Sequence, residues 1–342
     1  MSLNKNLHQA KREKNDEFYT QLTDIEKELH HYSQHFRDKT VYCNCDDSKA
    51  SQFFQYFWKK FRSLGLKKLV TTCYKNNDPE SFSLHMSKDS AGLSVSKNGG
   101  RRVSHELLGT EDFPLKGDGD FRSEECIEIL KQADIVVTNP PFSLLREYVA
   151  QLMEYDKRFL IVGNMNAISY KEIFPLIQSN KMWLGITPKG RDMLFDVRSE
   201  YAEELKATKK EGSAYRIVEG VIKGRLGNAA WFTNLDHKRR HEPLILYKRY
   251  NSEDYPVYDN YDAINVDKTK DIPKDYDGAM GVPISFLDKY NPEQFEILSA
   301  NDLRRNKQTP IKPHGLIKDK DGSIGGQPKY VRIVIRKRNV QS

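Results

Sequence analysis

The segment with the clearest chemical potential is Asn139-Pro140-Pro141-Phe142, which closes the apolar run 133–138. A strand that ends there places a carboxamide, a carbonyl and an aromatic ring at the carboxyl edge of a sheet, where open α/β folds bind ligands. The Asn139 side-chain oxygen and the Pro140 carbonyl can accept both hydrogens of an exocyclic amine, and Phe142 can stack on the ring that carries it. Such residues suit methyl transfer to an aromatic amine, because they act through positioning and fixed dipoles rather than through a strong base.

The same four residues also have a purely structural interpretation. Proline cannot extend a hydrogen-bonded ladder and restricts the residue before it, so Pro-Pro after a strand is a common way to end one. A short motif of this kind carries a considerable false-positive risk when it is taken alone. The surrounding elements and the composition of the chain must therefore decide between the two interpretations.

The chain around this motif predicts alternating strands and helices. Helical periodicity and turn signals predict one helix from cap residues at 46–48 to about Gly65, and others in the segments 124–132, 144–154 and 173–178. Apolar runs predict strands at 40–45, 68–73, 133–139, 158–163, 181–185, 230–233 and 244–247. This alternation favours an α/β fold with a largely parallel, doubly wound sheet up to about Tyr250. Recurrent prolines beyond it predict a loop-rich module, so the expected domains are 1–250 and 251–342.

The length and composition of the chain exclude several classes of protein. With 342 residues and 38% hydrophobic content, the chain has room for about two domains and at least one sizeable core. It opens on no charged-then-apolar leader, and no apolar stretch approaches the ~20 residues that cross a bilayer. We expect a cytoplasmic protein with reduced thiols, because the four cysteines are too sparse for a disulfide scaffold.

Two pairs of residues have a spacing that could suggest a metal. Cys43 and Cys45 would share one face of a strand, and His237 and His241 have a zinc-finger-like spacing. Neither pair has the second pair that a structural zinc with four ligands requires. The histidines flank a run of Lys and Arg, which favours a solvated or phosphate-facing basic turn, and no metal site is expected.

The positive charge of the chain is concentrated at its C-terminal end. The formal net charge is +7, and residues 302–342 contain eleven Lys and Arg against three Asp, a net of +8. A segment of one sign beside a nearly neutral remainder suggests a polyanion as partner. The run from Lys329 to Arg338 alternates basic and apolar residues, which predicts a strand with one wet, cationic face.

The motifs, taken in order, resemble those of the EcoRI-type family of adenine-specific DNA methyltransferases, in the γ group of amino-methyltransferases. The resemblance covers most of the chain and rests on the segments 16–20, 41–47, 117–123, 139–142, 231–234 and 281–297. It implies a Rossmann-like, S-adenosylmethionine-dependent core, followed by a C-terminal module that recognises double-stranded DNA. The implied activity is N6 methylation of a flipped adenine, in a restriction-modification system or as an orphan or phage methylase. A separately acting cognate endonuclease is the partner that such a system would add.

The resemblance implies roles for residues around the methionine part of the cofactor. Asn44 and the loop after it would lie under this part, with Asp46 or Asp47 holding its ammonium group. The N-terminal motif would close the same pocket through Phe18, Tyr19 and Thr20. The loop after the first strand contains no glycine, whereas methyltransferases generally carry a glycine-rich turn there so that the backbone can approach the cofactor.

The adenine and ribose parts of the cofactor have their own candidates. By the resemblance, Asp120 would accept a hydrogen bond from the adenine amine, and Phe121 would pack against the ring. After the second strand, Thr72-Cys73-Tyr74 has no acid for the ribose hydroxyls. Tyr74 is the candidate that could substitute for it by stacking.

Candidates for contact with DNA lie further along the chain. Trp231 or Phe232 would form the second face of a sandwich around the flipped base, where stacking contributes roughly 1–3 kcal/mol per base. The basic residues expected to touch phosphates or base edges are Arg304, Arg305, Lys307, Arg332, Arg336, Lys337 and Arg338.

Three other functions remain open from the sequence. Enzymes that methylate a protein glutamine or an RNA guanine amine also use Asn-Pro-Pro, but a basic module of about 90 residues suits duplex DNA better. A non-catalytic DNA-binding relative would explain the missing glycine, whereas the intact motif at 139–142 argues against decay. A restriction endonuclease ranks low, because no convincing Asp and Glu-x-Lys constellation is present.

Overall fold

A computed structural model describes most of the chain as two compact units. The described residues are 19–45, 51–72, 83–87, 92–95, 109–110, 115, 119–187, 193–197, 199–226, 228–305, 315–317 and 322–338. The first unit comprises Met1–Met165 and Thr187–Leu235, and the second comprises Asn166–Ile186 and Asp236–Ser342. None of the borders between these units lies at Tyr250. The division at Tyr250 into a catalytic and a DNA-recognition part stays a prediction.

The first unit is built on a mixed sheet. Its elements up to the motif are β1 (Tyr19–Thr20), α2 (Leu22–Leu29), η1 (His30–His35), β2 (Thr40–Asn44), α3 (Gln52–Leu64), β3 (Lys68–Thr72), β4 (Ser83–Ser87), β5 (Gly92–Val95), β6 (Gly109–Thr110), α4 (Glu124–Gln132) and β7 (Ile135–Thr138). After the motif come η2 (Phe142–Leu144), α5 (Leu145–Glu154), β8 (Arg158–Asn164), β10 (Met193–Asp196), α7 (Ser199–Thr208), β11 (Tyr215–Val218), β12 (Val221–Leu226) and β13 (Ala229–Thr233). The short helix η3 (Met165–Ser169) begins at the last residue of this segment and belongs mostly to the second unit.

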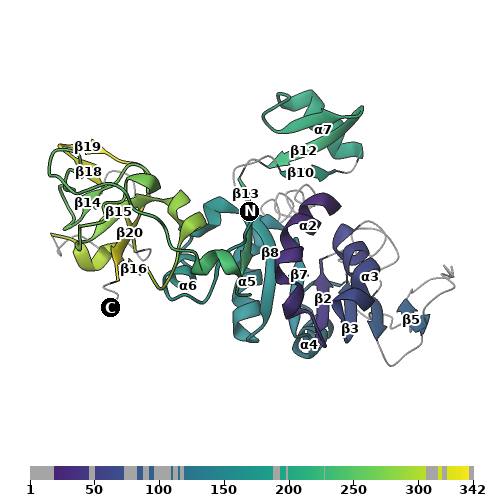
Figure 1. Cartoon of the computed structure of the whole chain (residues 1–342). Helices are drawn as coiled ribbons and strands as arrows, with labels where there is room; N and C mark the ends of the chain where they lie inside the picture. The colour runs from purple at the N-terminus through teal and green to yellow at the C-terminus, as the bar shows by residue number, and fades with distance from the viewer. Residues whose placement is uncertain are drawn as a thin grey trace, which may run out of the picture. The chain divides into compact units, whose positions relative to one another are not determined.

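The order of the strands places a switch point beside β2. The main sheet runs β6-β5-β4-β3-β2-β7-β8-β13, and β3, β2, β7 and β8 are mutually parallel (Figure 1). The chain leaves β2 toward β3 on one side and later returns as β7 on the other. In open α/β sheets, ligands bind outside the carboxyl ends of the strands at such a reversal of order. A smaller antiparallel sheet, β1-β10-β12-β11, completes the unit.

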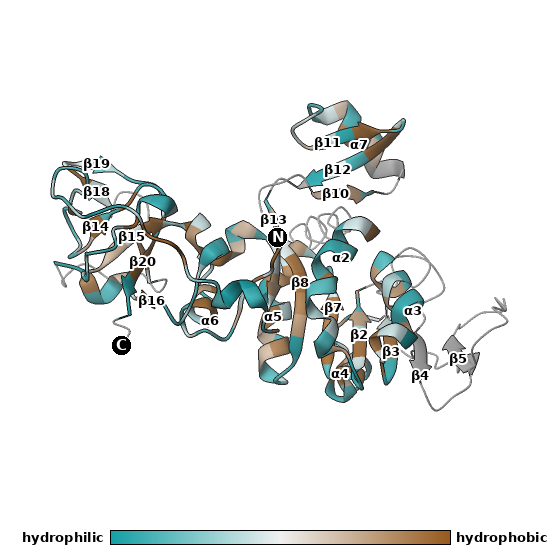
Figure 2. Ribbon diagram, viewed as in Figure 1, coloured by the Kyte–Doolittle hydropathy of each residue, from teal (hydrophilic) through white to brown (hydrophobic). Residues whose placement is uncertain are grey.

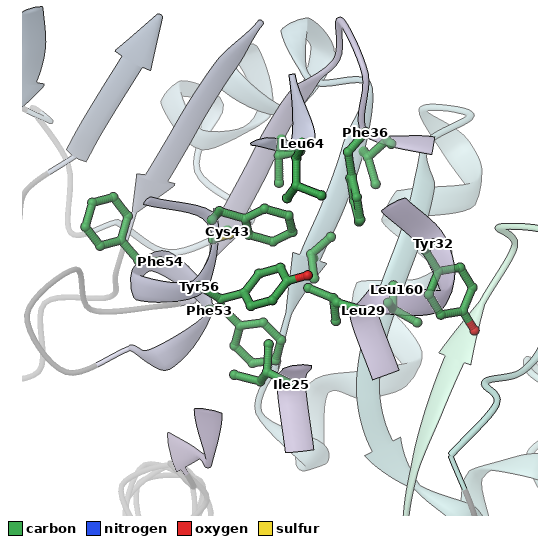
Figure 3. Close-up of a cluster of buried hydrophobic side chains, with 14 of the residues drawn as sticks. Ile25, Leu29, Tyr32, Phe36, Cys43, Phe53, Phe54, Tyr56, Leu64 and Leu160 are labelled. Atoms are coloured by element: carbon green, nitrogen blue, oxygen red, sulfur yellow. The ribbon is translucent and has the colours of Figure 1, made fainter. Parts of the chain in front are cut away.

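Helices cover both faces of the parallel strands. Val41 and Cys43 belong to the core cluster that α2 and α3 close (Figure 3). Helix α3 is amphipathic, is capped at its start by the Ser51 hydroxyl, and ends at Gly65, whose φ is 66°. Side chains of β2 on the other face meet α5, where Tyr148 donates a hydrogen bond to Asn44. Figure 2 shows the resulting pattern, with brown apolar strands between helices that turn teal faces outward.

The second unit is centred on its last strand. Its elements are α6 (Phe174–Gln178), β9 (Trp183–Leu184), η4 (Lys238–His241), β14 (Ile264–Asn265), η5 (Thr269–Asp271), β15 (Met280–Pro283), η6 (Ile284–Lys289), β16 (Phe295–Leu298), η7 (Ala300–Leu303), β17 (Leu316–Ile317), β18 (Ser323–Ile324), β19 (Gln327–Pro328) and β20 (Arg332–Lys337). Strand β20 pairs antiparallel with β15, β16 and β17, while β14 runs parallel to β15.

Two expectations about this unit are wrong. The segment 244–247 is not a strand, although its backbone has no helical structure either. Strand β20 has no wet face along most of its length, because Arg332, Ile333, Val334 and Ile335 are all buried. Alternation of basic and apolar residues suggested one exposed face, but a strand with neighbours on both sides and an apolar cluster around Val334 is covered on both faces.

Candidate active site

The motif at 139–142 stands at the switch point of the main sheet. All four residues of β7 are buried, and β7 lies between β2 and β8. The strand stops at Asn139 because the two following prolines have no N–H to donate. The side-chain oxygen of Asn139 is buried, and the partly buried Phe142 packs against the core cluster. The motif therefore occupies the carboxyl edge at which the sequence predicted it.

The end of β2 is tied directly to this edge. The hydroxyl of Thr138, the residue before Asn139, donates a hydrogen bond to the backbone carbonyl of Asn44. Tyr148 of α5 donates another to the side-chain oxygen of Asn44, which is 1% exposed. Cys45 follows with a φ of 64°, in the left-handed region that favours glycine. Cys45, the residue that follows β2, thus has the backbone conformation for which glycine is ordinarily used.

A third turn, at 119–123, approaches the same helix α5. Phe121 is 5% exposed and meets the ring of Tyr148 edge-on, with 5.0 Å between the ring centroids. The Nε2 of Gln151 donates to the Phe121 carbonyl at 3.1 Å. Ser123 then caps α4 through the amide of Cys126. The turn is therefore fixed by one helix that it begins and by another that it packs against.

Asp120 in this turn is held in its charged form. Its carboxylate accepts hydrogen bonds from the backbone and side chain of Arg122, the shortest at 2.7 Å. Burial alone would raise the pKa of Asp120, but the hydrogen bonds and charge of Arg122 outweigh it, and the net pKa is lowered. Arg122 also pairs with Glu147 of α5 at 3.1 Å. An ionised Asp120 is an acceptor only, which suits an amine donor.

Strand β1 contributes one buried hydroxyl that has no partner. Thr20 is 3% exposed, and within the part of the chain that the structure describes its Oγ1 makes no hydrogen bond. Tyr19 and Thr20 pair with Asp196 and Phe195 of β10. A buried hydroxyl without a partner is unfavourable by roughly 1–3 kcal/mol. A bound group that formed a hydrogen bond with the Thr20 hydroxyl would remove this penalty.

Several predicted site residues fall outside the described residues. They are Phe18, Asp46, Asp47, Tyr74 and Lys307. Their roles stay predictions.

Trp231 and Phe232 are core residues. Trp231 is 2% exposed and packs edge-on against Phe53, at 5.9 Å between centroids. Phe232 is 1% exposed and points to the other face of β13, where it lies against Gly163. A Cβ at Gly163 would stand 2.9 Å from Leu145 and 3.0 Å from Phe232, so glycine permits this close packing. Neither ring offers a face to a base here, and β13 pairing with β8 explains both positions.

The predicted basic residues of the second unit are largely bound to groups of that unit. Arg304 and Arg332 are buried, at 8% and 7% exposure. Arg332 bonds the Asn265 side chain and pairs with Asp267 at 3.4 Å. Arg305 pairs with Asp262 at 2.8 Å. These guanidinium groups hold the fold together, so a base-reading role for Arg332 conflicts with its burial.

The end of β20 follows the same pattern. Arg336 pairs with Glu296 at 2.6 Å, and Lys337 pairs with Asp277 at 3.4 Å. The Nε of Arg338 donates to the Pro292 carbonyl at 2.8 Å. Each of these three cations therefore has an acceptor within the second unit.

Three functional candidates were not found from the sequence. Tyr148 and Gln151 lie on α5 and read as ordinary amphipathic positions, while Cys45 reads as half of a thiol pair. Only the fold brings them to the carboxyl ends of β2 and β7. The one sequence signal was negative, namely the missing glycine that Cys45 replaces.

Metal and membrane functions find no support in the described ranges. Within them, no group of three or more His, Cys, Asp or Glu side chains could hold a metal ion. Nor does any helix there have the length and apolar character to cross a membrane.

Comparison with known proteins decides the family. The family model for the adenine-specific methyltransferase EcoRI matches residues 6–338. The chain belongs to this family of adenine-specific DNA methyltransferases. It is 48% identical over 341 residues to the Type II methyltransferase M.EcoRI of Escherichia coli, covering 99% of this chain and 98% of the relative.

Two mycoplasma proteins are also similar over nearly their whole length. Type II methyltransferase M.MgeORF184P of Mycoplasma genitalium is 37% identical, covering 97% of this chain and 99% of its own. Type II methyltransferase M.MpnI of Mycoplasma pneumoniae is 37% identical, covering 97% and 98%. No solved structure gives a significant match. The resemblance seen in the motifs is confirmed across the chain.

Proposed function

We propose that this chain methylates the N6 of a specific adenine in duplex DNA, with S-adenosylmethionine as methyl donor and the target base flipped out of the helix. The observation that carries the proposal is the position of Asn139 at the switch point of the sheet, beside the ends of β2 and the turn at 119–123. The family membership supports the adenine specificity. The Rossmann-like character of the core is supported by the parallel order β3-β2-β7-β8 with helices on both faces.

The chemistry requires an amine that is a poor nucleophile to become a better one. The lone pair of the adenine amine is delocalised into the ring. Asn139 and the Pro140 carbonyl would accept its two hydrogens and favour tetrahedral geometry at nitrogen, and Phe142 would hold the ring by stacking. A bound donor would supply the methyl group in exchange for its S–C bond, and the surplus amine proton would leave to solvent. Fixed dipoles of this kind need no reorganisation at the moment of reaction.

The described residues fit the methyl donor in three places. S-adenosylmethionine supplies an electrophilic methyl group on a sulfonium when it is bound. Thr20 has a buried hydroxyl that lacks a partner, Asp120 is an ionised acceptor for an amine, and Phe121 offers an apolar ring. The Asn44 side-chain oxygen already accepts a hydrogen bond from Tyr148, so Asn44 shapes the pocket.

DNA backbone contacts are assigned to the second unit in this proposal. We name residues 238–250 the basic strap, which contains five Lys and Arg and one Glu. Lys238, Lys248 and Arg249 are exposed, and none makes an ion pair with another described residue. Phosphate contacts supply most of the sequence-independent affinity for DNA. The strap suits this role better than the side chains of β20, which have acceptors of their own.

The strap is also held in shape. Leu244 exchanges two hydrogen bonds with the Gln294 side chain, at 2.7 and 2.8 Å. The Lys248 carbonyl accepts from Lys274 at 2.9 Å, and the Tyr250 amide donates to Asp275 at 2.7 Å. Such anchoring reduces the conformational entropy that the strap would lose on binding DNA.

The glutamine amide of a protein and the guanine amine of RNA are the competing substrates. A cognate endonuclease is an expectation that follows from the type of system.

Transfer of a radiolabelled methyl group, followed by digestion to nucleosides, tests the proposal. Label is expected in N6-methyladenine of duplex DNA. Asn139→Ala should slow the single-turnover rate by about 10²–10³, the usual loss for one preorganised transition-state contact. Asn234→Ala is a matched control, because its carboxamide bonds the backbone at Phe159 and Lys157 at 2.7 and 2.9 Å, at the opposite end of β8. Label found in protein or RNA alone, or an unchanged rate in Asn139→Ala, overturns it.

A further inference from the structure

Tyr148 is a fully buried polar residue with contacts to two separate turns. Its side chain is 0% exposed, and its hydroxyl donates to the side-chain oxygen of Asn44, 104 positions away in sequence. The same ring packs edge-on against Phe121. One side chain of α5 thus reaches the end of β2 with its polar tip and the 119–123 turn with its apolar body.

Its neighbours on α5 repeat this arrangement. Gln151 donates to the Phe121 carbonyl, and Glu147 pairs with Arg122, which in turn holds Asp120. Residues 147, 148 and 151 lie on one side of the helix, because positions three and four apart are neighbours on a helix surface. Helix α5 begins at Leu145, directly after the motif at 139–142. A single rigid helix therefore connects the motif with both turns.

An ordinary core would not need these polar groups. A buried hydroxyl without a bond is unfavourable, and phenylalanine would fill nearly the same volume at position 148. The hydrogen bonds of Tyr148 and Gln151 and the ion pair of Glu147 described above lead to the two turns rather than to the helix itself. The hydroxyl of Thr138 holds the same residue, Asn44, from the strand that carries Asn139. Asn44 is thereby fixed from both the catalytic strand and the helix that follows it.

We propose that Tyr148 is a positioning residue for the methyl donor, fixing the end of β2 relative to the adenine-facing turn so that both parts of the cofactor are met at once. This rests on the proposed function, since both turns belong to the cofactor pocket in it. Tyr148 acts through Asn44 and Phe121 and touches neither reacting atom. Its loss weakens cofactor binding and leaves the chemical step at saturating cofactor nearly unchanged.

Tyr148→Phe tests this by removing only the hydroxyl. Titration calorimetry with S-adenosylhomocysteine should show about five- to tenfold weaker binding, the usual effect of one hydrogen bond. The KM for S-adenosylmethionine should rise by the same factor, while kcat stays within about twofold. Tyr32→Phe is the matched control: it removes a bond of 2.8 Å to Glu28 from another fully buried tyrosine of the first unit. That variant should lose a similar amount of thermal stability and bind the cofactor as the unaltered protein does.

A double-mutant cycle with Asn44→Ala separates positioning from general softening. If the hydroxyl acts through Asn44, the effects of Tyr148→Phe and Asn44→Ala on the binding free energy are not additive. Gln151→Met, which deletes the bond to Phe121, supplies a second variant should Tyr148→Phe melt earlier than its control. Equal cofactor affinity in Tyr148→Phe and Tyr32→Phe, or full additivity in the cycle, overturns the proposal. Failure of the proposed function is distinct. A wrong target would appear as label in protein or RNA while the Tyr148→Phe effect on cofactor binding persists, and a wrong cofactor would appear as no binding of S-adenosylhomocysteine to the unaltered protein.

Discussion

Two basic segments of the second unit differ in the exposure and the partners of their charged side chains. Strand β20 and the residue after it, 332–338, contain four Lys and Arg, and the basic strap contains five. In β20, Arg332 is buried and Arg336, Lys337 and Arg338 each have an acceptor within the unit. In the strap, Lys238, Lys248 and Arg249 extend into solvent. The other two cations of the strap are bound within the unit, because Arg240 is buried against the ring of Trp183 and Arg239 donates to the Ile186 carbonyl. The comparison teaches that a count of charges predicts a polyanion partner but not the surface that meets it.

The difference has a physical cause in the neighbours of each segment. Residues 332–335 of β20 are buried beside an apolar cluster, and the cations that follow them have acceptors within the same unit. The strap pairs with none of the described strands and is anchored at a few backbone points, and several of its side chains project outward. Ile245 and Tyr247 are 67% and 75% exposed beside its cations. An apolar and aromatic row flanked by positive charge is typical of a surface that contacts nucleic acid.

The largest effect is expected from breaking the core under β20. Val334→Asp places a charge at a position that is 0% exposed within an apolar cluster. An uncompensated buried charge destabilises by about 3–5 kcal/mol, which is comparable to the stability of a small domain. DNA binding should be lost while S-adenosylhomocysteine still binds. Val257→Asp is the control, because Val257 is 44% exposed, and it should leave both activities intact.

Charge reversal compares the two segments directly. Lys238→Glu, Lys248→Glu and Arg249→Glu together should weaken DNA binding and reduce the slope of log K against log salt by up to about 2.7, or about 0.9 for each lost phosphate contact. Fluorescence anisotropy at several salt concentrations measures both. Arg336→Glu, Lys337→Glu and Arg338→Glu change the net charge equally and should alter the slope far less. If the β20 triple variant instead lost more DNA affinity and more of the salt slope than the strap variant, the surface that contacts DNA would lie on β20 and not on the strap.

The position of the catalytic motif could be predicted from the sequence, whereas the surroundings of the basic residues could not. The motif at 139–142 follows an apolar run, and helix α4 spans Glu124–Gln132 as expected, because both depend on local pattern and turn chemistry. Trp231 and Phe232 were misassigned because an aromatic pair has the same signal in a core as in a base-stacking site. Their burial depends on β13 pairing with β8, a contact between segments about 70 residues apart.

The sequence also could not predict which buried polar side chains contact each other. Tyr148 and Asn44 are 104 residues apart, and nothing in either neighbourhood predicts that they meet. Arg332 could not be separated from Arg336 by residue type, although only Arg332 of the two is buried. Position in the fold, rather than composition, decides which polar groups are structural.

The smallest expected effect is a pH dependence at the start of the strap. The two ring nitrogens of His241 lie 2.9 Å from Asp236 and 3.1 Å from Glu293, and Glu293 precedes the Gln294 that anchors Leu244. Hydrogen bonds to Asp236 first, and to Glu293 second, raise the pKa of His241 above its ordinary 6.5.

A pKa that is raised in the folded state adds stability that is fully present below the unfolded pKa and is lost as pH rises through the folded pKa. Thermal unfolding of the second unit should therefore move to lower temperature as pH increases from about 6.5, with a modest amplitude because the ring is partly exposed and such pairs are screened. His241→Gln should flatten this dependence, and DNA affinity should fall slightly over the same range. An unchanged pH profile in His241→Gln would show that the strap is held by the Gln294, Lys274 and Asp275 contacts alone.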